Sequence, residues 1–135
     1  MFPCLISKTP SSADQRHPYV TTPVSLRGTW YQYDQAGHYF MKMTITKYTW
    51  SVDYAPHYAT TVSSKRIIPH TSMTQLACPQ LKSHGYWQLK QNHTEYSMLL
   101  KRGSIKINRQ KITVLKNYYP NAPQAVSVWT TRKIR

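Results

Sequence analysis

Apolar and polar residues alternate in short runs along most of the chain from Leu26 onward, and this alternation constrains the fold more than any other feature. A period of two predicts β-strands with one buried face, and no long stretch has the period of a helix. The clearest run places on one face the residues Tyr39, Met41, Met43 and Ile45. Short turns separate the runs, so about eight or nine strands should form an antiparallel meander. Because a meander has two open edges unless it closes, we expect a single all-β, up-and-down antiparallel β-barrel of about eight strands.

A chain of 135 residues is expected to form one domain with a buried core. Residues 1–24 mix serine, threonine, proline and charged side chains, which predicts an irregular N-terminal leader. Residues 25–135 then form the barrel domain. The segment 55–84 has the weakest pattern, because Pro69 and Pro79 interrupt its short apolar runs, and we assign no strand boundaries there.

The first strand of the barrel is predicted to begin at Leu26, and it carries the sequence Gly28-Thr29-Trp30. At these residues the chain resembles the calycin superfamily, which comprises the lipocalins and their relatives. The resemblance implies an eight-stranded barrel in which Trp30 plugs the closed end and an arginine of the last strand lies across its indole. Arg132 shares its parity with Val126 and Val128, the valines predicted to face inward from the last strand, so we expect it to point inward and stack on Trp30.

A more specific resemblance rests on Leu26-Arg27-Gly28-Thr29-Trp30-Tyr31 together with Met43-Thr44-Ile45-Thr46. These segments look like those of the small, basic, secreted lipocalin-like proteins of lactobacilli, whose functions are largely unknown. As a pattern, the resemblance spans residues 26–132. It implies a structural signature that consists of Gly28, Trp30 and Arg132.

Bulky residues on the inward parity are expected to fill much of the barrel, since an eight-stranded barrel has room for side chains or one small ligand. The residues predicted to line this interior are Met41, Met43, Trp50, Trp87, Tyr96 and Met98. We therefore expect a narrow pocket or none, at the end of the barrel away from Trp30. A carrier that takes a small apolar ligand in the barrel mouth is one alternative function.

The charge of the chain is strongly positive, because 18 Lys and Arg against four acidic residues give a formal net charge of +14. Such a surface concentrates anionic polymers, whether nucleic acid, anionic lipid or an anionic cell-wall polymer. Lys101, Lys106 and Lys116 are assigned outward parities in successive strands, so they could form one basic stripe, although a solvated sheet face would have the same pattern. The leading hypothesis is a non-enzymatic binding module, secreted or at the cell surface, that associates with an anionic envelope polymer.

Nucleic-acid binding is the other alternative, because basic residues interleave with aromatic ones, as in small barrels that stack bases over a cationic groove. Trp50, Trp87 and Tyr96 share the parity of aliphatic neighbours, however, and a role in the core explains them first. Tyr31 and Tyr33 lie on the other face of the first strand and are the better candidates for an exposed platform.

The sequence offers no constellation for catalysis or metal binding. Its four acidic residues are isolated, so no carboxylate pair is evident for general acid–base chemistry: Asp14, Asp34, Asp53 and Glu95. No nucleophile motif occurs, and the six histidines lack the spacing of metal ligands. We therefore predict a non-enzymatic protein without a cofactor or a metal.

The two cysteines, Cys4 and Cys78, have no CxxC spacing, and two unpaired thiols are preferred to a bridge between them. No apolar run approaches the ~20 residues that span a bilayer, so no transmembrane segment is predicted. The apolar start of the chain, residues 1–6, is too short for the core of a signal peptide. A secreted or cell-surface location therefore requires a leader that this chain does not show, and a cytoplasmic location is the alternative.

Overall fold

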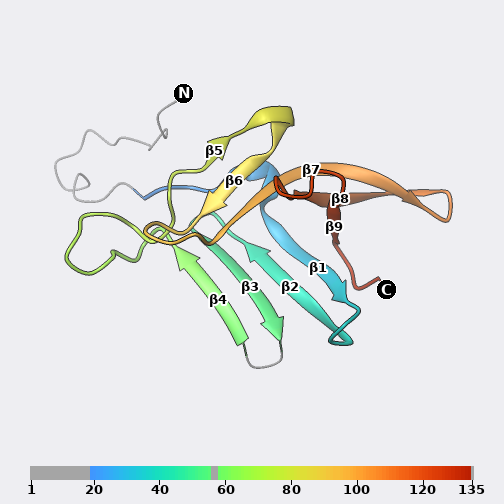
Figure 1. Ribbon diagram of the computed structural model, residues 1–135, viewed down its shortest axis with the longest axis horizontal. Coiled ribbons are helices and arrows are strands. Elements are labelled where there is room, and N and C mark those ends of the chain that lie inside the picture. The colour runs from blue at the N-terminus through green and yellow to red at the C-terminus, as the bar shows by residue number, and fades with distance from the viewer. Residues whose placement is uncertain (1–18, 56–57, 135) are drawn as a thin grey trace.

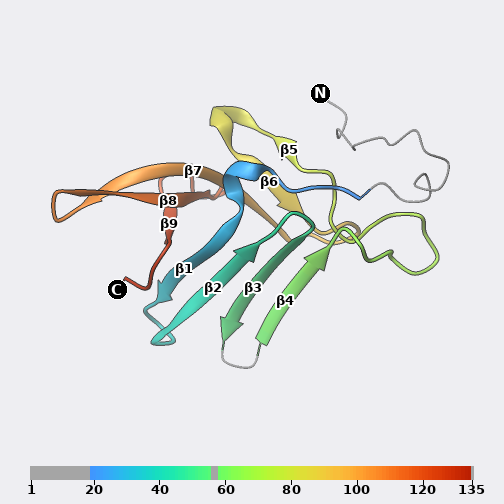
Figure 2. The same cartoon turned by 180° about the vertical axis from the view of Figure 1, so that it is seen from behind.

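The computed structural model describes residues 19–55 and 58–134, which form one antiparallel sheet. The strands are β1 (Gly28–Asp34), β2 (Tyr39–Ile45), β3 (Thr49–Ala55), β4 (Tyr58–Ser63), β5 (Gln80–Leu81), β6 (Trp87–Lys90), β7 (Ser97–Ile107), β8 (Gln110–Tyr118) and β9 (Ser127–Thr130). Within these described residues the strands are accompanied by two 3-10 helices, η2 (Val24–Leu26) and η3 (Ser83–Gly85). The strand order is β4-β3-β2-β1-β9-β8-β7-β6-β5, so the first and last strands join the two halves of the sheet. Figures 1 and 2 show this sheet curling, with β1–β4 in one wall and β5–β8 in the other.

The prediction of an all-β antiparallel fold is confirmed, but the prediction of a closed eight-stranded barrel is wrong. Nine strands form a half-barrel whose edge strands, β4 and β5, do not pair with each other. The segment between them crosses from one wall to the other as a loop, in which Leu76 N donates to Ser63 O at 3.4 Å and Ala77 N donates to Lys90 O at 2.9 Å. Because β5 has only two residues, it offers too few backbone partners to close the sheet.

Tight turns set the register of the first three strands. At the end of β1, His38 N donates to Asp34 O at 2.8 Å, and His38 has a φ of 58°. Between β2 and β3, Ile45 pairs with Trp50, and both side chains are buried. The inward parity therefore changes across the turn that contains Lys47, as the sequence predicts.

The concave face of the sheet holds the core, whose largest fully buried side chains are Trp30, Trp50 and Trp129. Residues 19–27 cover one end of this core, with Leu26 fully buried and Val20 only 7% exposed. Thr22 Oγ1 fixes the segment by donating to Thr46 O at 2.7 Å. The last residues of the predicted leader thus pack against the sheet, while residues 1–18 lie outside the described residues.

Cys78 is disulfide-bonded, so the interpretation of this residue as an unpaired thiol is wrong. Cys4, the other cysteine of the sequence, lies outside the described residues. In the parts of the chain that the structure describes, no helix has the length and apolar character needed to cross a membrane.

Candidate functional site

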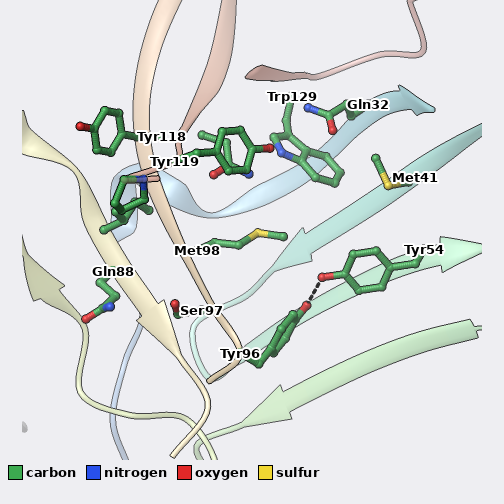
Figure 3. A pocket seen from close by; sticks show the side chains of 13 residues that line it. Gln32, Met41, Tyr54, Gln88, Tyr96, Ser97, Met98, Tyr118, Tyr119 and Trp129 are labelled. Atoms are coloured by element: carbon green, nitrogen blue, oxygen red, sulfur yellow. Dashed lines mark hydrogen bonds between the residues drawn. The ribbon is translucent and has the colours of Figure 1, made fainter. Parts of the chain in front are cut away.

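The concave face contains a cavity of about 360 Å³ beyond the covered end of the core (Figure 3). One wall contributes Gln32 of β1, Met41 of β2 and Tyr54 of β3. The remaining lining residues are Gln88, Tyr96, Ser97, Met98, Leu99, Asn117, Tyr118, Tyr119, Pro120 and Trp129. Trp30 lies at the end of β1 that residues 19–27 cover. Gln32, which lines the cavity, lies further along the same strand. The cavity is therefore at the end of the half-barrel away from Trp30, where the sequence predicts any pocket to be.

Trp129 of β9 is the lining residue that sequence reasoning missed. The predicted inward residues of this strand were Val126 and Val128, but Val126 is 42% exposed whereas Trp129 is 1% exposed. Trp129 therefore takes the inward position opposite Leu115 of β8. Its indole Nε1 is buried without a hydrogen-bond partner in the described part of the chain, and Figure 3 shows the indole at the edge of the cavity beside Tyr119.

Two tyrosines from opposite walls meet at the cavity. The hydroxyls of Tyr54 on β3 and Tyr96 just before β7 form a hydrogen bond, which Figure 3 shows as a dashed line. The Tyr96 ring also stacks on Trp50, with ring centroids 4.7 Å apart and an interplanar angle of 8°. Burial raises the pKa of both hydroxyls, and for Tyr96 the hydrogen bond with Tyr54 raises it further. This contact spans the space between strands that are not neighbours in the sheet.

The other polar groups of the cavity are neutral. Gln32 Nε2 donates to Val128 O at 3.0 Å, and the Tyr119 hydroxyl is hydrogen-bonded to Ser127 Oγ at 2.9 Å. Asn117 is 3% exposed and also lines the cavity. None of the thirteen lining residues is an Asp, Glu, Lys, Arg, His or Cys, so the lining offers aromatic and thioether surface with a few hydrogen-bonding groups.

The structure divides the predicted interior residues into two groups. Three of them line the cavity, namely Met41, Tyr96 and Met98. Met43 and Trp50 are fully buried in the core and do not reach the cavity. Trp87 is partly buried and packs against the core without lining the cavity. Trp50 Nε1 and Ser64 Oγ are buried without partners as well, but neither residue borders the cavity.

Of the three predicted signature residues, Gly28 and Trp30 lie together at the covered end of the sheet, whereas Arg132 does not. Trp30 is 2% exposed, and its Nε1 donates to Leu26 O at 3.0 Å. Gly28 has a φ of 140°, and a Cβ there would lie 3.5 Å from the Trp30 indole. The prediction for Arg132 is wrong: this residue is exposed and follows the end of β9. The guanidinium above the Trp30 ring belongs to Arg102 of β7, at 5.7 Å from the ring centroid.

The three lysines of the predicted basic stripe do not share one face. Lys101 of β7 pairs directly with Lys116 of β8, so these two side chains lie on the same side of the sheet. Lys106 is an odd number of residues from Lys101 in the same strand and pairs with Lys111 instead. Because strand residues alternate between faces, Lys106 lies on the opposite side, and the single stripe is wrong.

Within the described residues, no group of three or more His, Cys, Asp or Glu side chains is arranged to hold a metal ion. Comparisons with protein-family models, curated proteins and solved structures find no match to this chain. The resemblance to calycins therefore stays a prediction, and the cavity has to be interpreted from its own chemistry.

Proposed function

We propose that the protein is a non-enzymatic binding module that holds one small, neutral, largely apolar molecule in the cavity of the half-barrel. The observation that carries this proposal is Trp129 Nε1, a buried donor without a partner beside an aromatic cavity. Leaving a buried donor unsatisfied costs about 1–3 kcal/mol, and native proteins rarely do so without a reason. A ligand with a carbonyl, ether or hydroxyl oxygen would supply the missing acceptor.

The size and lining of the cavity support this class of ligand. A volume of about 360 Å³ falls in the range of small-molecule sites, which are mostly apolar with a few placed polar groups. Tyr54, Tyr96 and Trp129 offer ring surfaces, and Met41 and Met98 offer adaptable thioether contacts. Because no lining side chain carries a formal charge at neutral pH, a neutral molecule is desolvated there at the least cost.

The proposal includes a lipocalin-like relationship and export from the cytoplasm. Support for the first comes from Gly28-Thr29-Trp30 at the start of β1, with Trp30 buried at the covered end of the sheet. Support for the second comes from the disulfide at Cys78, since disulfides are rare in reducing compartments. From the sequence alone, association with an envelope polymer is the leading hypothesis. The cavity makes the binding of a small ligand the function that we propose instead.

The test uses two neutral fluorescent probes that differ in one acceptor. Prodan is a naphthalene with a dimethylamino group and a propionyl carbonyl, and dimethylaminonaphthalene lacks that carbonyl. Both should bind, and Trp129→Phe should weaken prodan binding by roughly three- to tenfold while it leaves the second probe almost unchanged. This factor corresponds to the loss of one neutral hydrogen bond.

The matched control is Trp87→Phe, because Trp87 is partly buried but does not line the cavity. This variant should bind both probes as the parent does. If neither probe binds the parent protein, or if Trp87→Phe and Trp129→Phe change prodan binding equally, the proposed site is wrong.

A further inference from the structure

The hairpin of β7 and β8 extends beyond the rest of the sheet as a two-stranded ribbon. β6 pairs with β7 only at residues 97–100, and β9 pairs with β8 only at residues 114–117. Residues 101–113, called the ribbon here, therefore pair only with the other strand of the hairpin. Figures 1 and 2 show the ribbon reaching sideways, away from the other strands. Its tip is the two-residue turn Asn108–Arg109, in which both residues have positive φ.

Cations are concentrated in this hairpin without any acidic residue to balance them. Residues 101–116 contain Lys101, Arg102, Lys106, Arg109, Lys111 and Lys116. The four acidic residues of the chain all precede position 96. The positive charge of this part of the molecule is therefore not offset by neighbouring carboxylates along the chain.

The register places two pairs of like charges directly opposite each other. Lys101 pairs with Lys116, and Lys106 pairs with Lys111. Directly opposed like charges destabilise an antiparallel pair of strands, so these lysines are unfavourable for the hairpin by itself. An anion that bridges each pair would remove the repulsion.

The cations of the hairpin differ in whether their side chains bond to other parts of the protein. Lys101 Nζ donates to His84 O at 2.8 Å, and Arg102 Nη1 donates to Ser25 O at 3.2 Å. Lys106, Arg109 and Lys111 are exposed, and their side chains make no hydrogen bond or ring contact in the described structure. The three cations nearest the tip are thus available to an external partner.

The shape of the ribbon favours a polymer over a small anion. From Lys101 to Ile107 a strand spans roughly 20 Å, at about 3.4 Å per residue, and cations lie on both faces over this length. A single small anion could contact one level of the ribbon at a time, whereas a flexible chain can contact several levels. Lysine ammonium groups are point charges that suit phosphate groups without fixed orientation.

Two observations separate a phosphate polymer of the envelope from nucleic acid. Proteins that bind single strands stack bases on aromatic side chains, and residues 101–116 contain no aromatic residue. The disulfide at Cys78 favours an oxidising environment outside the cytoplasm. We infer that the ribbon is a binding site for a flexible phosphodiester polymer of the cell envelope, contacted mainly by Lys106, Arg109 and Lys111.

The experiment measures the binding of fluorescently labelled poly(glycerol phosphate) by anisotropy over a series of salt concentrations. The ribbon variant combines Lys106→Gln, Arg109→Gln and Lys111→Gln. The matched control combines Lys42→Gln, Arg66→Gln and Lys82→Gln, which also removes two lysines and one arginine from exposed positions. The ribbon variant should bind at least about tenfold more weakly at low salt. Its slope of log affinity against log salt should be smaller by about 2, since each phosphate contact on a single strand contributes ~0.7.

A second variant separates binding from folding. Lys111→Glu turns an opposed like-charge pair into an opposite-charge pair, so it should weaken polymer binding without lowering the melting temperature. Prodan binding in the cavity should be the same in every ribbon variant, which keeps this inference independent of the proposed function. Equal losses in the ribbon and control variants would overturn the inference and leave only diffuse attraction by charge. Tighter binding of single-stranded or duplex DNA than of poly(glycerol phosphate) at matched salt would assign the ribbon to nucleic acid instead.

Discussion

Trp30 and Trp129 lie on the same concave face and are almost equally buried, at 2% and 1% exposed, but they use their indole N–H groups differently. Trp30 at the covered end donates to Leu26 O at 3.0 Å. Trp129 at the cavity has no partner for its Nε1 in the described part of the chain. The two indoles are therefore equally buried but unequally hydrogen-bonded, and of the buried indoles without a partner in the described residues, Trp50 lies in the core and Trp129 borders the cavity.

The surroundings of the two indoles extend this difference. Around Trp30, residues 19–27 supply both a cover and a carbonyl acceptor, and Arg102 lies above the ring. Around Trp129, the neighbouring polar groups of Gln32 and Tyr119 bond to β9 backbone or side chain instead. The Trp30 N–H is therefore satisfied within the protein, whereas the Trp129 N–H borders the cavity and has no partner in the described residues.

The largest expected effect is the loss of the indole at the covered end. Trp30→Ala should lower the free energy of unfolding by about 3–5 kcal/mol, as expected for a fully buried large-to-small substitution. Met41→Ala at the cavity edge removes a partly buried side chain and should cost about 1 kcal/mol. Denaturant unfolding of both variants measures the difference. Equal losses would contradict the division of the half-barrel into a covered structural end and a ligand end.

The tyrosine pair at the cavity should make stability depend on alkaline pH. Burial raises the pKa of Tyr54 and Tyr96 above the ordinary value of 10.0, so the folded state binds more protons than the unfolded state above that pH. Their contribution to stability is complete below pH 10 and is lost as the pH rises through the folded-state values. Unfolding experiments between about pH 8 and pH 11 should therefore show a falling free energy of unfolding at the alkaline end.

Tyr96→Phe should flatten that alkaline decline, because phenylalanine has no proton to lose. Tyr19→Phe is the matched control, since Tyr19 is 40% exposed and its ring contacts Tyr48 rather than the tyrosine pair, so its replacement should leave the decline as it is in the parent. A decline of unchanged steepness in Tyr96→Phe would show that other groups cause the pH dependence.

The sequence predicts the strands and inward residues well where alternation is long. β2 and β3 each have seven residues, and the predicted change of inward parity between them is confirmed by the burial of both Ile45 and Trp50. The last strand has only four residues, which is too short for alternation to identify its inward face. The prediction therefore followed two valines of one parity and assigned the tryptophan between them and the strand end to the outward face. The size of the Trp129 side chain is the signal that could have reversed this choice, because large aromatic side chains dominate core packing.

Other features depend on contacts between distant parts of the chain. Alternation within strands does not reveal whether the two sheet edges meet, because closure depends on the length of β5 and on the loop that joins β4 to it. Nor does it reveal that Arg102 rather than Arg132 lies above Trp30, since this depends on how β7 crosses η2 in space. The separation of Lys106 from Lys101, in contrast, follows from their odd spacing and could have been predicted from the sequence.

The smallest expected effect isolates the two N–H groups themselves. Benzothienylalanine has the shape of tryptophan but carries sulfur in place of the indole N–H. At position 30 this replacement should cost about 1 kcal/mol, because it removes the bond to Leu26 O. At position 129 it should leave the free energy of unfolding unchanged or slightly higher, since the group removed has no partner in the described structure, and prodan binding should weaken. If the replacement destabilises position 129 as much as position 30, the Trp129 N–H is already satisfied within the protein, and the cavity loses its strongest claim to a ligand with an acceptor.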